Sequence, residues 1–218
     1  MDIIFIKESL CFLLRGAFIS LQIAFIACMI GLTLGTILAL IQTSKQKLLK
    51  FIVTIYVTII RGTPMLVQIM IVFYIFPQLG IDISAFWSAA LAIGLNSAAY
   101  LSQTIKSGIS SIGIGQWEAA QVLGFNKIQT LQFIILPQAI RVIIPALGNE
   151  FITLIKDSSL ASTIGVVELV KEGSIIISRT YKVIPVYYMI TGIYLIITTL
   201  LSLSLSKIEH RMNKHAQN

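Results

Sequence analysis

Charged and hydroxyl side chains interrupt an apolar stretch near residue 156, and their types suit the binding of a small polar solute. The run that follows the apolar residues 151–155 reads Lys156-Asp157-Ser158-Ser159-Leu160-Ala161-Ser162. Because Asp and Ser favour helix N-termini, we expect one helix to end and another to begin here. N–H groups at the new helix start would suit a carboxylate, and Asp157 would suit an ammonium group, so the site could hold a zwitterion. The alternative is an ordinary helix cap beside a solvated Lys156–Asp157 pair.

Further polar side chains recur at helical spacing. Glu150 lies seven residues before Asp157, which places both carboxylates on nearly the same helix face. At about 100° per residue, one polar stripe comprises Asn96, Tyr100, Gln103 and Ser107, and a second comprises Tyr187, Thr191, Tyr194 and Thr198. Both stripes should point away from lipid. They either bond helices to one another or line a path for a polar solute.

The other reactive residue types lack the spacing of catalytic groups. His210 and His215 lie in a charged C-terminal segment, where a solvated surface is the simplest interpretation. Cys11 and Cys28 lie in apolar stretches without metal-ligand or redox spacing, so we expect buried thiols and no metal site. An enzyme is therefore a poor interpretation of the sequence.

The elements that carry these residues must be membrane helices, because the chain has too little charge for a water-facing surface. Its 218 residues are 56% apolar and 11% charged, with a mean hydropathy of +0.91, whereas soluble domains are about 25% charged. The net charge of +7 lacks the Lys/Arg clustering of a nucleic-acid-binding face. The composition argues against a soluble enzyme, a disordered chain and a nucleic-acid partner, and it predicts an all-α integral membrane protein.

Five stretches are long enough to cross a bilayer, whose core of roughly 30 Å needs about 20 helical residues. We expect a single domain, 1–218, with a loop at 106–137 and spans at about 16–41, 63–79, 86–105, 138–155 and 184–205. Arg61-Gly62-Thr63-Pro64 divides the second apolar stretch, because Pro disfavours helix at the residue before it. Residues 51–60 would then form an interfacial helix, with Arg61 at the membrane surface.

Basic residues predict the orientation. The segments 42–62, 106–141 and 206–218 hold ten Lys and Arg, and the other face holds six. This bias places the N-terminus outside and the C-terminus in the cytoplasm, with basic residues near lipid headgroups. In the first span, Ala24, Cys28, Gly31 and Gly35 form a small-residue face, which we expect to pack within this subunit rather than across a dimer.

The loop 106–137 has the pattern of a helix-turn-helix. Residues 115–123 are rich in Ala, Gln and Glu, and Gly124 suits a helix C-terminus. Asn126 can cap a second helix, from Lys127 to about Leu136, which Pro137 would end. Because its apolar faces would be partly exposed on a lone subunit, the loop predicts a protein partner.

The same loop resembles the signature of a transporter family. Glu118-Ala119-Ala120, three residues, Gly124, nine residues, Ile134, one residue and Leu136-Pro137 match the full EAA motif of permease subunits of ATP-binding-cassette (ABC) importers. Two segments look like those of polar amino acid permeases of the histidine, glutamine, arginine or cystine type: Arg61-Gly62-Thr63-Pro64-Met65-Leu66-Val67-Gln68 and Lys156-Asp157-Ser158-Ser159-Leu160. The chain departs from the family at Gln103 and Lys106, where an acid and an Arg are usual, and at Ser158, where Thr is usual.

The resemblance implies the type I importer permease fold, with five transmembrane helices and a cytoplasmic EAA coupling helix between helices 3 and 4. It implies a second permease subunit, identical or similar, an ATP-binding subunit dimer on the cytoplasmic face and an extracytoplasmic solute-binding protein. No cofactor is expected in this chain, which lacks the Gly-x-x-x-x-Gly-Lys-Ser/Thr loop, so ATP and magnesium would belong to the ATPase. The residues expected to couple to it are Glu118, Ala119, Ala120, Gly124 and Pro137.

The expected function is import of a polar amino acid across the cytoplasmic membrane, with motifs closest to glutamine- or arginine-type permeases. The residues expected to line the substrate pathway are Gln68, Asn96, Tyr100, Gln103, Glu150, Asp157, Ser158 and Ser159, while Arg61, Gly62 and Pro64 would shape the break. A five-span permease for methionine or another small solute is one alternative, which uptake competition would separate. A gated channel, conducting without ATP, and a membrane scaffold, tolerant of changes at Asn96 and Gln103, are the others.

Overall fold

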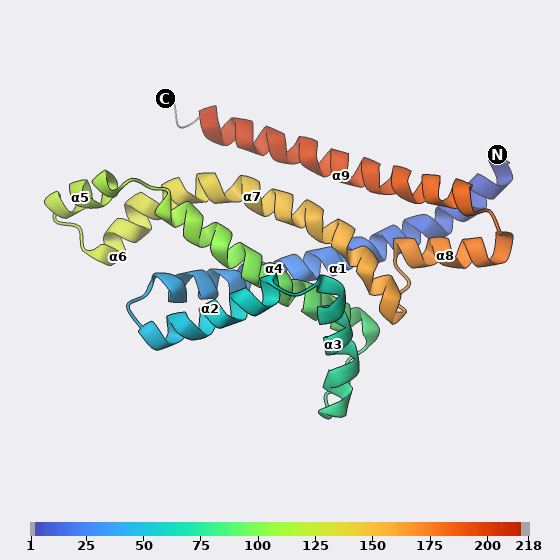
Figure 1. The fold of residues 1–218 in the computed structure, drawn as a ribbon. Coiled ribbons are helices and arrows are strands. Elements are labelled where there is room, and N and C mark those ends of the chain that lie inside the picture. The colour runs from blue at the N-terminus through green and yellow to red at the C-terminus, as the bar shows by residue number, and fades with distance from the viewer. Residues whose placement is uncertain (1–2, 215–218) are drawn as a thin grey trace.

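The computed structural model describes residues 3–214, which form helices joined by short connections (Figure 1). The helices are α1 (Ile3–Thr43), α2 (Lys47–Arg61), α3 (Met65–Gln78), α4 (Ala85–Ser110), α5 (Ile114–Val122), α6 (Lys127–Thr130), a π-helical turn (Leu131–Ile135), α7 (Leu136–Asp157), a 3₁₀ helix (Ser158–Ile164), α8 (Leu169–Thr180) and α9 (Val183–Lys214). No strand occurs between residues 3 and 214, as the all-α prediction requires. His215 lies outside the described residues.

The pair α1 and α4 forms the most extensive helix contact in the described part of the chain. A Cβ atom added at Gly31 would lie 2.7 Å from Ser97 Oγ, and one added at Gly35 would lie 3.0 Å from Leu101 Cβ. The absence of side chains at these two glycines is therefore what lets the helices approach. The prediction that this small-residue face packs within the subunit is confirmed.

The main apolar core lies where α1, α3, α4 and α7 meet. Ile23, Ile69, Ile93 and Leu154 contribute one side chain from each of these helices, and each is almost fully buried. Burying such a side chain stabilises a structure by about 1.5–3 kcal/mol. This packing holds α4 and α7 in register, and these two helices carry most of the predicted polar residues.

Three helical segments are long and apolar enough to cross a membrane by length and composition: Ile4–Thr43, Lys127–Ile164 and Val183–Met212. A fourth is added if α2 and α3, which meet at an angle of 106°, form one broken span. α3 alone has 14 residues, about 21 Å of helix, which is shorter than the hydrocarbon core. The count of five spans therefore stays a prediction, and α1 begins well before the expected residue 16.

The predicted break near Arg61 is present, with α2 ending at Arg61 and α3 beginning at Met65. The Gly62 N–H donates to Thr58 O at 2.9 Å, and Pro64 has the extended backbone of an N-cap, with φ −65° and ψ 136°. Because Pro lacks an N–H and fixes φ, it separates the two helices and allows their sharp angle. α2 begins at Lys47, earlier than expected, and its interfacial position stays a prediction.

The predicted helix-turn-helix is also present. α5 ends before Gly124, whose φ of +81° lies in the left-handed region that favours glycine. Asn126 caps the next helix: its side chain accepts from the N–H groups of Ile128 and Gln129, and the Gln129 side chain accepts from the Asn126 N–H. Figure 1 shows α5 and α6 at the same end of the molecule as the α1–α2 connection and opposite α8.

Pro137 does not end the second helix, so that prediction was wrong. The π-helical turn joins α6 directly to α7, and Pro137 is the second residue of α7. The Leu136 N–H donates to Leu131 O, five residues back, in place of the usual four. In such a widened turn one backbone carbonyl does not take part in the usual helical hydrogen bonds. The N–H group that Pro137 lacks is therefore not needed to bond it. The EAA loop therefore continues into α7 without a stop.

Candidate functional site

A polar cavity of about 410 Å³ brings half of the predicted pathway residues together. We call it the acidic cavity, and its lining residues are Thr63, Pro64, Met65, Asn96, Tyr100, Glu150, Thr153 and Asp157. They come from the α2–α3 break, α4 and α7, which lie far apart in sequence. Two carboxylates, an amide and a phenol around one cavity could bind an ammonium or guanidinium group together with other polar groups of a solute.

Gln68 lies behind this cavity and not in its lining. Its Nε2 donates to Ile60 O at 2.8 Å and to Thr63 Oγ1 at 2.8 Å, across the α2–α3 break. Its Oε1 accepts a hydrogen bond from Asn96 Nδ2 at 2.9 Å. Gln68 therefore holds the break together and orients the Asn96 amide, which makes it a positioning residue.

Glu150 and Asp157 are half-buried and lie two turns apart on the same side of α7, as predicted. Glu150 Oε1 accepts from Ser97 Oγ at 2.7 Å, which ties α7 to α4. The Asp157 side chain makes no capping hydrogen bond to the 3₁₀ helix that follows it. The position of Asp157 on the cavity wall thus favours the interpretation as a solute ligand over that of an ordinary cap.

The expected free helix N-terminus after Asp157 is absent from this stretch, so that part of the prediction was wrong. The chain passes from α7 directly into the 3₁₀ helix, and the Ser158 N–H is bonded to Leu154 O. The fully buried Ser158 hydroxyl donates to Ile155 O at 2.7 Å, and Ser159 is likewise absent from the lining of the acidic cavity. Neither serine therefore lines the acidic cavity, and the Ser158 hydroxyl is bonded to the backbone of α7.

A second cavity, of about 490 Å³, adjoins the first at Tyr100. We call it the arginine cavity, and its lining residues are Arg61, Tyr100, Gln103, Thr104, Ser107, Gly108, Ser111, Val142 and Ala146. The Arg61 guanidinium lies over the Tyr100 ring, 5.1 Å from its centroid. The polar stripe of α4 therefore lines both cavities in turn, as one face. Because Arg61 borders a polar cavity, its charge can be accommodated without a place at the membrane surface.

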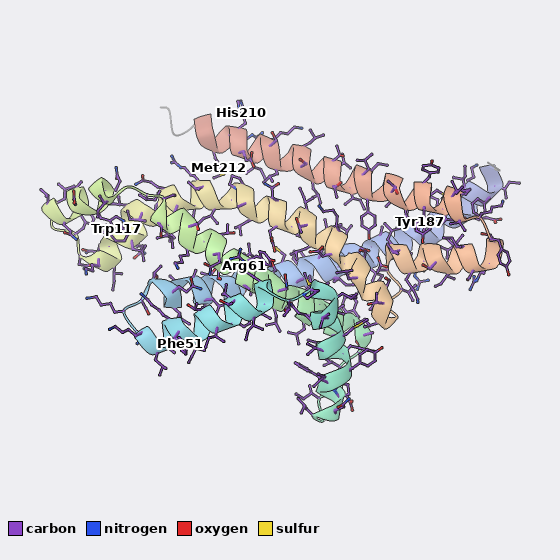
Figure 2. All side chains as sticks on the ribbon, viewed as in Figure 1. Phe51, Arg61, Trp117, Tyr187, His210 and Met212 are labelled. Carbon is purple, nitrogen blue, oxygen red and sulfur yellow. The ribbon has the colours of Figure 1, made fainter. Side chains whose placement is uncertain are left out.

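The second polar stripe faces inward only in part. Tyr194 is half-buried, whereas Tyr187, labelled in Figure 2, is 51% exposed and Thr191 is exposed as well. Thr198 donates to Tyr194 O on its own helix at 2.8 Å. The prediction that the whole stripe points inward was therefore wrong, because the other helices of this subunit leave Tyr187 and Thr191 uncovered.

Glu168 is a buried acid that the sequence analysis did not single out. It is fully buried, and it caps α8 by accepting from the N–H groups of Val170 and Lys171. Ser20 Oγ donates to Glu168 Oε2 at 3.2 Å, and Tyr194 Oη donates to the same oxygen at 3.5 Å. Glu168 thus joins α8 to α1 and α9. An acid directly before a short amphipathic helix is the local signal that could have identified the cap.

The EAA loop presents some of its predicted residues outward and turns one inward. Glu118, Ala119 and Gly124 are exposed, whereas Ala120 is 1% exposed and packs within the subunit. Trp117, labelled in Figure 2, is half-buried against the apolar cluster of the π-helical turn and α7. Glu118 and Ala119 are therefore accessible from outside the subunit, whereas Ala120 is not.

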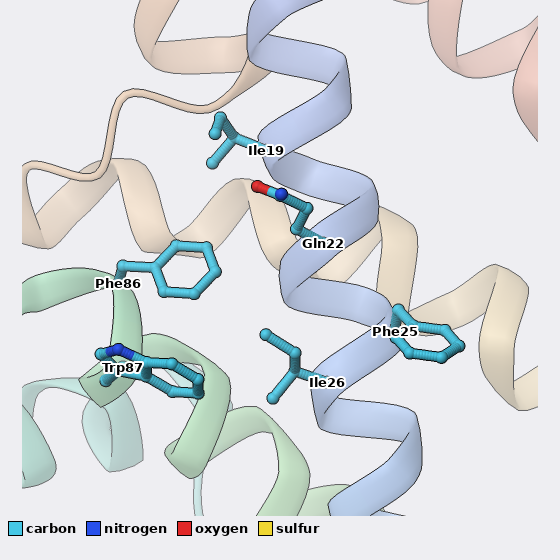
Figure 3. Close-up of a pocket in the computed structure, with 6 residues that line it drawn as sticks. All are labelled: Ile19, Gln22, Phe25, Ile26, Phe86 and Trp87. Atoms are coloured by element: carbon cyan, nitrogen blue, oxygen red, sulfur yellow. The ribbon is translucent and has the colours of Figure 1, made fainter.

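A further cavity, of about 560 Å³, lies elsewhere, between α1 and α4 (Figure 3). Its lining is mostly apolar: Ile19, Gln22, Phe25, Ile26, Phe86 and Trp87. Gln22 supplies its one side-chain amide, and no acid or base lies among these six residues. The cavity lacks the charged groups that would discriminate between polar solutes, so size alone does not make it the candidate site.

Comparison with solved structures identifies the class of protein to which this fold belongs. A crystal structure of an amino acid ABC transporter with histidines matches at a TM-score of 0.92 and 36% identity, covering 97% of this chain and 99% of that one. An inward-facing structure of the MetNI methionine ABC transporter matches at a TM-score of 0.78 but 19% identity, over 97% and 99% of the two chains, and shares the fold. The chain therefore has the type I importer permease fold, as predicted.

Sequence comparison leads to the family. The L-cystine transport system permease protein TcyB of Bacillus subtilis (strain 168) is 41% identical over 201 residues, which cover 92% of this chain and 86% of that protein. Residues 31–214 match the family described as binding-protein-dependent transport system inner membrane component, and the chain belongs to this family. It is the inner-membrane permease subunit of an ABC importer, a transport subunit that works with a separate ATP-binding subunit and a solute-binding protein.

Proposed function

We propose that this chain imports a polar amino acid through the acidic cavity, driven by ATP hydrolysis in the partner subunit. The observation that carries the proposal is the convergence of Asn96, Tyr100, Glu150 and Asp157 on one cavity. An amino acid presents an ammonium group that the two carboxylates suit. The similarity to an L-cystine permease and to an amino acid transporter with histidines supports the same substrate class.

The coupling route follows from the continuous helix. Glu118 and Ala119 would enter a groove of the ATPase, and closure of the ATPase pair would move α5. Trp117 packs α5 against the π-helical turn and α7, and α7 runs without interruption to Glu150 and Asp157. Movement at the loop would therefore change the walls of the acidic cavity, because ATP can bias two states only through contacts that differ between them.

The assembly would contain a second permease subunit, identical or similar, beside this one. The N-terminus would lie outside, where α8 faces the solute-binding protein, and α5 would face the cytoplasm. The ten-to-six distribution of basic residues supports this orientation.

Uptake by the complete importer in liposomes tests the proposed function. ATP-dependent uptake of labelled glutamine, arginine, cystine and histidine, each with a panel of unlabelled competitors, should identify at least one polar amino acid. Asp157→Asn and Glu150→Gln should each raise the KM for that substrate about tenfold or more, because each removes one charge from the cavity. Asp82→Asn, at an exposed acid outside the cavity, is the matched control. An unchanged KM in both cavity variants would remove the site.

A further inference from the structure

The two adjoining cavities carry opposite charge. Glu150 and Asp157 are the charged residues in the lining of the acidic cavity, and Arg61 is the charged residue in that of the arginine cavity. Along α4 the lining continues from Tyr100 through Gln103 and later residues toward α5. Figure 2 shows Arg61 near the middle of the molecule, away from Trp117 at the α5 end. A fixed positive charge thus lies between the acidic cavity and the α5 end.

This order of charges matters for ions. An acid-lined cavity attracts K⁺ and Na⁺ as well as an ammonium group, and hydroxyls and amides beyond it would let those ions continue. A guanidinium keeps its positive charge in proteins, and such a charge in a pathway is a barrier to cations. A zwitterion has no net charge, so the repulsion of its ammonium group is offset by the attraction of its carboxylate.

We propose that Arg61, held against Tyr100, is the cation barrier of the transport pathway. It stops inorganic cations collected by the acidic cavity from passing toward α5, and it lets a zwitterionic amino acid pass. The Tyr100 ring fixes the guanidinium at the junction of the two cavities, because it contributes to both linings and stacks with Arg61 at 5.1 Å. The inference rests on the proposed function for the direction of flow and adds a selectivity residue to it.

Potassium efflux from liposomes that contain the complete importer tests this proposal. The liposomes hold K⁺ inside and a large organic cation outside, and efflux is measured without ATP or amino acid and again during ATP-driven uptake. Arg61→Gln should raise efflux about tenfold or more over wild type in at least one of these states, whereas Arg61→Lys, which keeps the charge, should stay within about threefold of it. Efflux at the wild-type rate from Arg61→Gln in both states overturns the proposal.

A relocated charge separates an electrostatic role from a structural one. Thr104 lines the same cavity, so Arg61→Gln combined with Thr104→Arg should return efflux to within about threefold of wild type. If Arg61 only shaped the α2–α3 break, the arginine introduced at position 104 would not lower K⁺ efflux. Efflux that stays high in the double variant therefore counts against the barrier. Should Arg61→Gln fail to assemble, Tyr100→Leu releases the guanidinium and should raise efflux, and wild-type tightness there overturns the proposal.

The two proposals fail in different ways, because the first of the two efflux measurements needs neither ATP nor substrate. If the Arg61→Gln complex leaks K⁺ and the wild-type complex takes up no polar amino acid, the proposed function is wrong. The proposal that Arg61 is a cation barrier then still stands. A wild-type complex that takes up amino acid, with an Arg61→Gln variant that stays tight to K⁺, would remove the barrier alone.

Discussion

Gln68 links the α2–α3 break to the acidic cavity, because its amide bonds to the part-buried Ile60 O and to the buried Asn96 amide. Gln68→Leu keeps most of the volume but leaves Ile60 O and the Asn96 amide without this partner. We expect the melting temperature of the purified complex to fall by several degrees, since a buried polar group left unpaired costs about 1–3 kcal/mol. Gln22→Leu, at an exposed amide of α1, is the control. Equal melting temperatures for the two variants would contradict the role of Gln68.

Glu168 predicts a dependence of stability on pH. Burial raises the pKa of its carboxyl above the ordinary value, and the hydrogen bonds from Val170, Lys171, Ser20 and Tyr194 lower it part of the way back. Since an unfolded glutamate has a pKa of about 4.3, the raised folded pKa favours the folded state below that pH. This contribution is lost as pH rises through the folded pKa.

Melting curves of wild type and Glu168→Gln over a pH series measure this contribution. The melting temperature of wild type relative to the variant should fall as pH rises above about 4.3, and it should become constant above the folded pKa. A difference that rises with pH would show that the hydrogen bonds, rather than burial, dominate the titration of Glu168.

The sequence alone predicts which residues share a helix face when all of them lie on the same helix. The spacing of Asn96 and Tyr100, and of Glu150 and Asp157, was enough to predict shared faces, and the structure joins both pairs in one cavity. The burial of Glu168 could not be predicted, because its partner Ser20 lies 148 residues away in sequence.

At the scale of elements, the end of α5 depends on Gly124. A Cβ atom there would meet no other atom within 4 Å, but a side chain is strained at a φ of +81°. Gly124→Asp should therefore strain the turn by about 1–2 kcal/mol and shift α5 relative to α6. The variant should then hydrolyse ATP without matching uptake. The ratio of amino acid transported to ATP hydrolysed measures this coupling.

Gly115→Asp supplies the matched control for coupling. Gly115 lies in the same helix, also has open space around its Cβ position, and has no positive φ. The control should keep the wild-type ratio of transport to hydrolysis. Equal coupling in both variants would remove the strained α5 terminus as the cause.

The contact between α1 and α4 gives a second prediction at this scale. Gly31→Ala would bring a methyl group to 2.7 Å from Ser97 Oγ, so the helices must separate. The melting temperature should fall, because overpacking costs about 1–3 kcal/mol. Gly192→Ala, in α9 with open space at the Cβ position, should not lower it, since Ala favours helix over Gly. A loss of stability of the same size in both variants would contradict the packing interpretation.

Helix boundaries set by residues that start or end a helix locally were predicted well, whereas the start of α7 was not. Pro64, Gly124 and Asn126 each act through their own backbone, so the break and the turn appear at the expected residues. Pro137 would end an ordinary helix, but the π-helical turn before it removes the conflict. Ile135 in that turn is fully buried in an apolar cluster that also contains residues of α4 and α7, and no local pattern in the sequence reports this tertiary packing.

At the scale of the whole molecule, hydropathy and motif contribute different information. Hydropathy predicted an all-helical membrane protein, but α3 is too short for a simple span, and α4 carries a polar stripe. The EAA spacing identified the importer class, which hydropathy alone does not distinguish from other membrane proteins. The family match over 31–214 agrees with the motif and leaves the number of spans open to measurement.

The α5 end of the molecule should be the ATPase-docking end, because its apolar side chains are left uncovered. Val122 is 88% exposed and Leu123 is 73% exposed, and both lie at the end of α5, the helix that carries the exposed Glu118. A protein partner that covers this surface would bury both side chains, so Val122→Asp should reduce copurification of the ATPase subunit in detergent about tenfold or more.

Tyr181→Asp provides the comparison at the opposite end of the molecule. Tyr181 follows α8 and is 87% exposed, yet its replacement should leave the ATPase bound, because α8 lies away from α5 (Figure 1). Loss of the ATPase from the Tyr181→Asp complex, with full retention by Val122→Asp, would reverse the proposed orientation. If both variants retain the ATPase, docking does not depend on the apolar surface of α5.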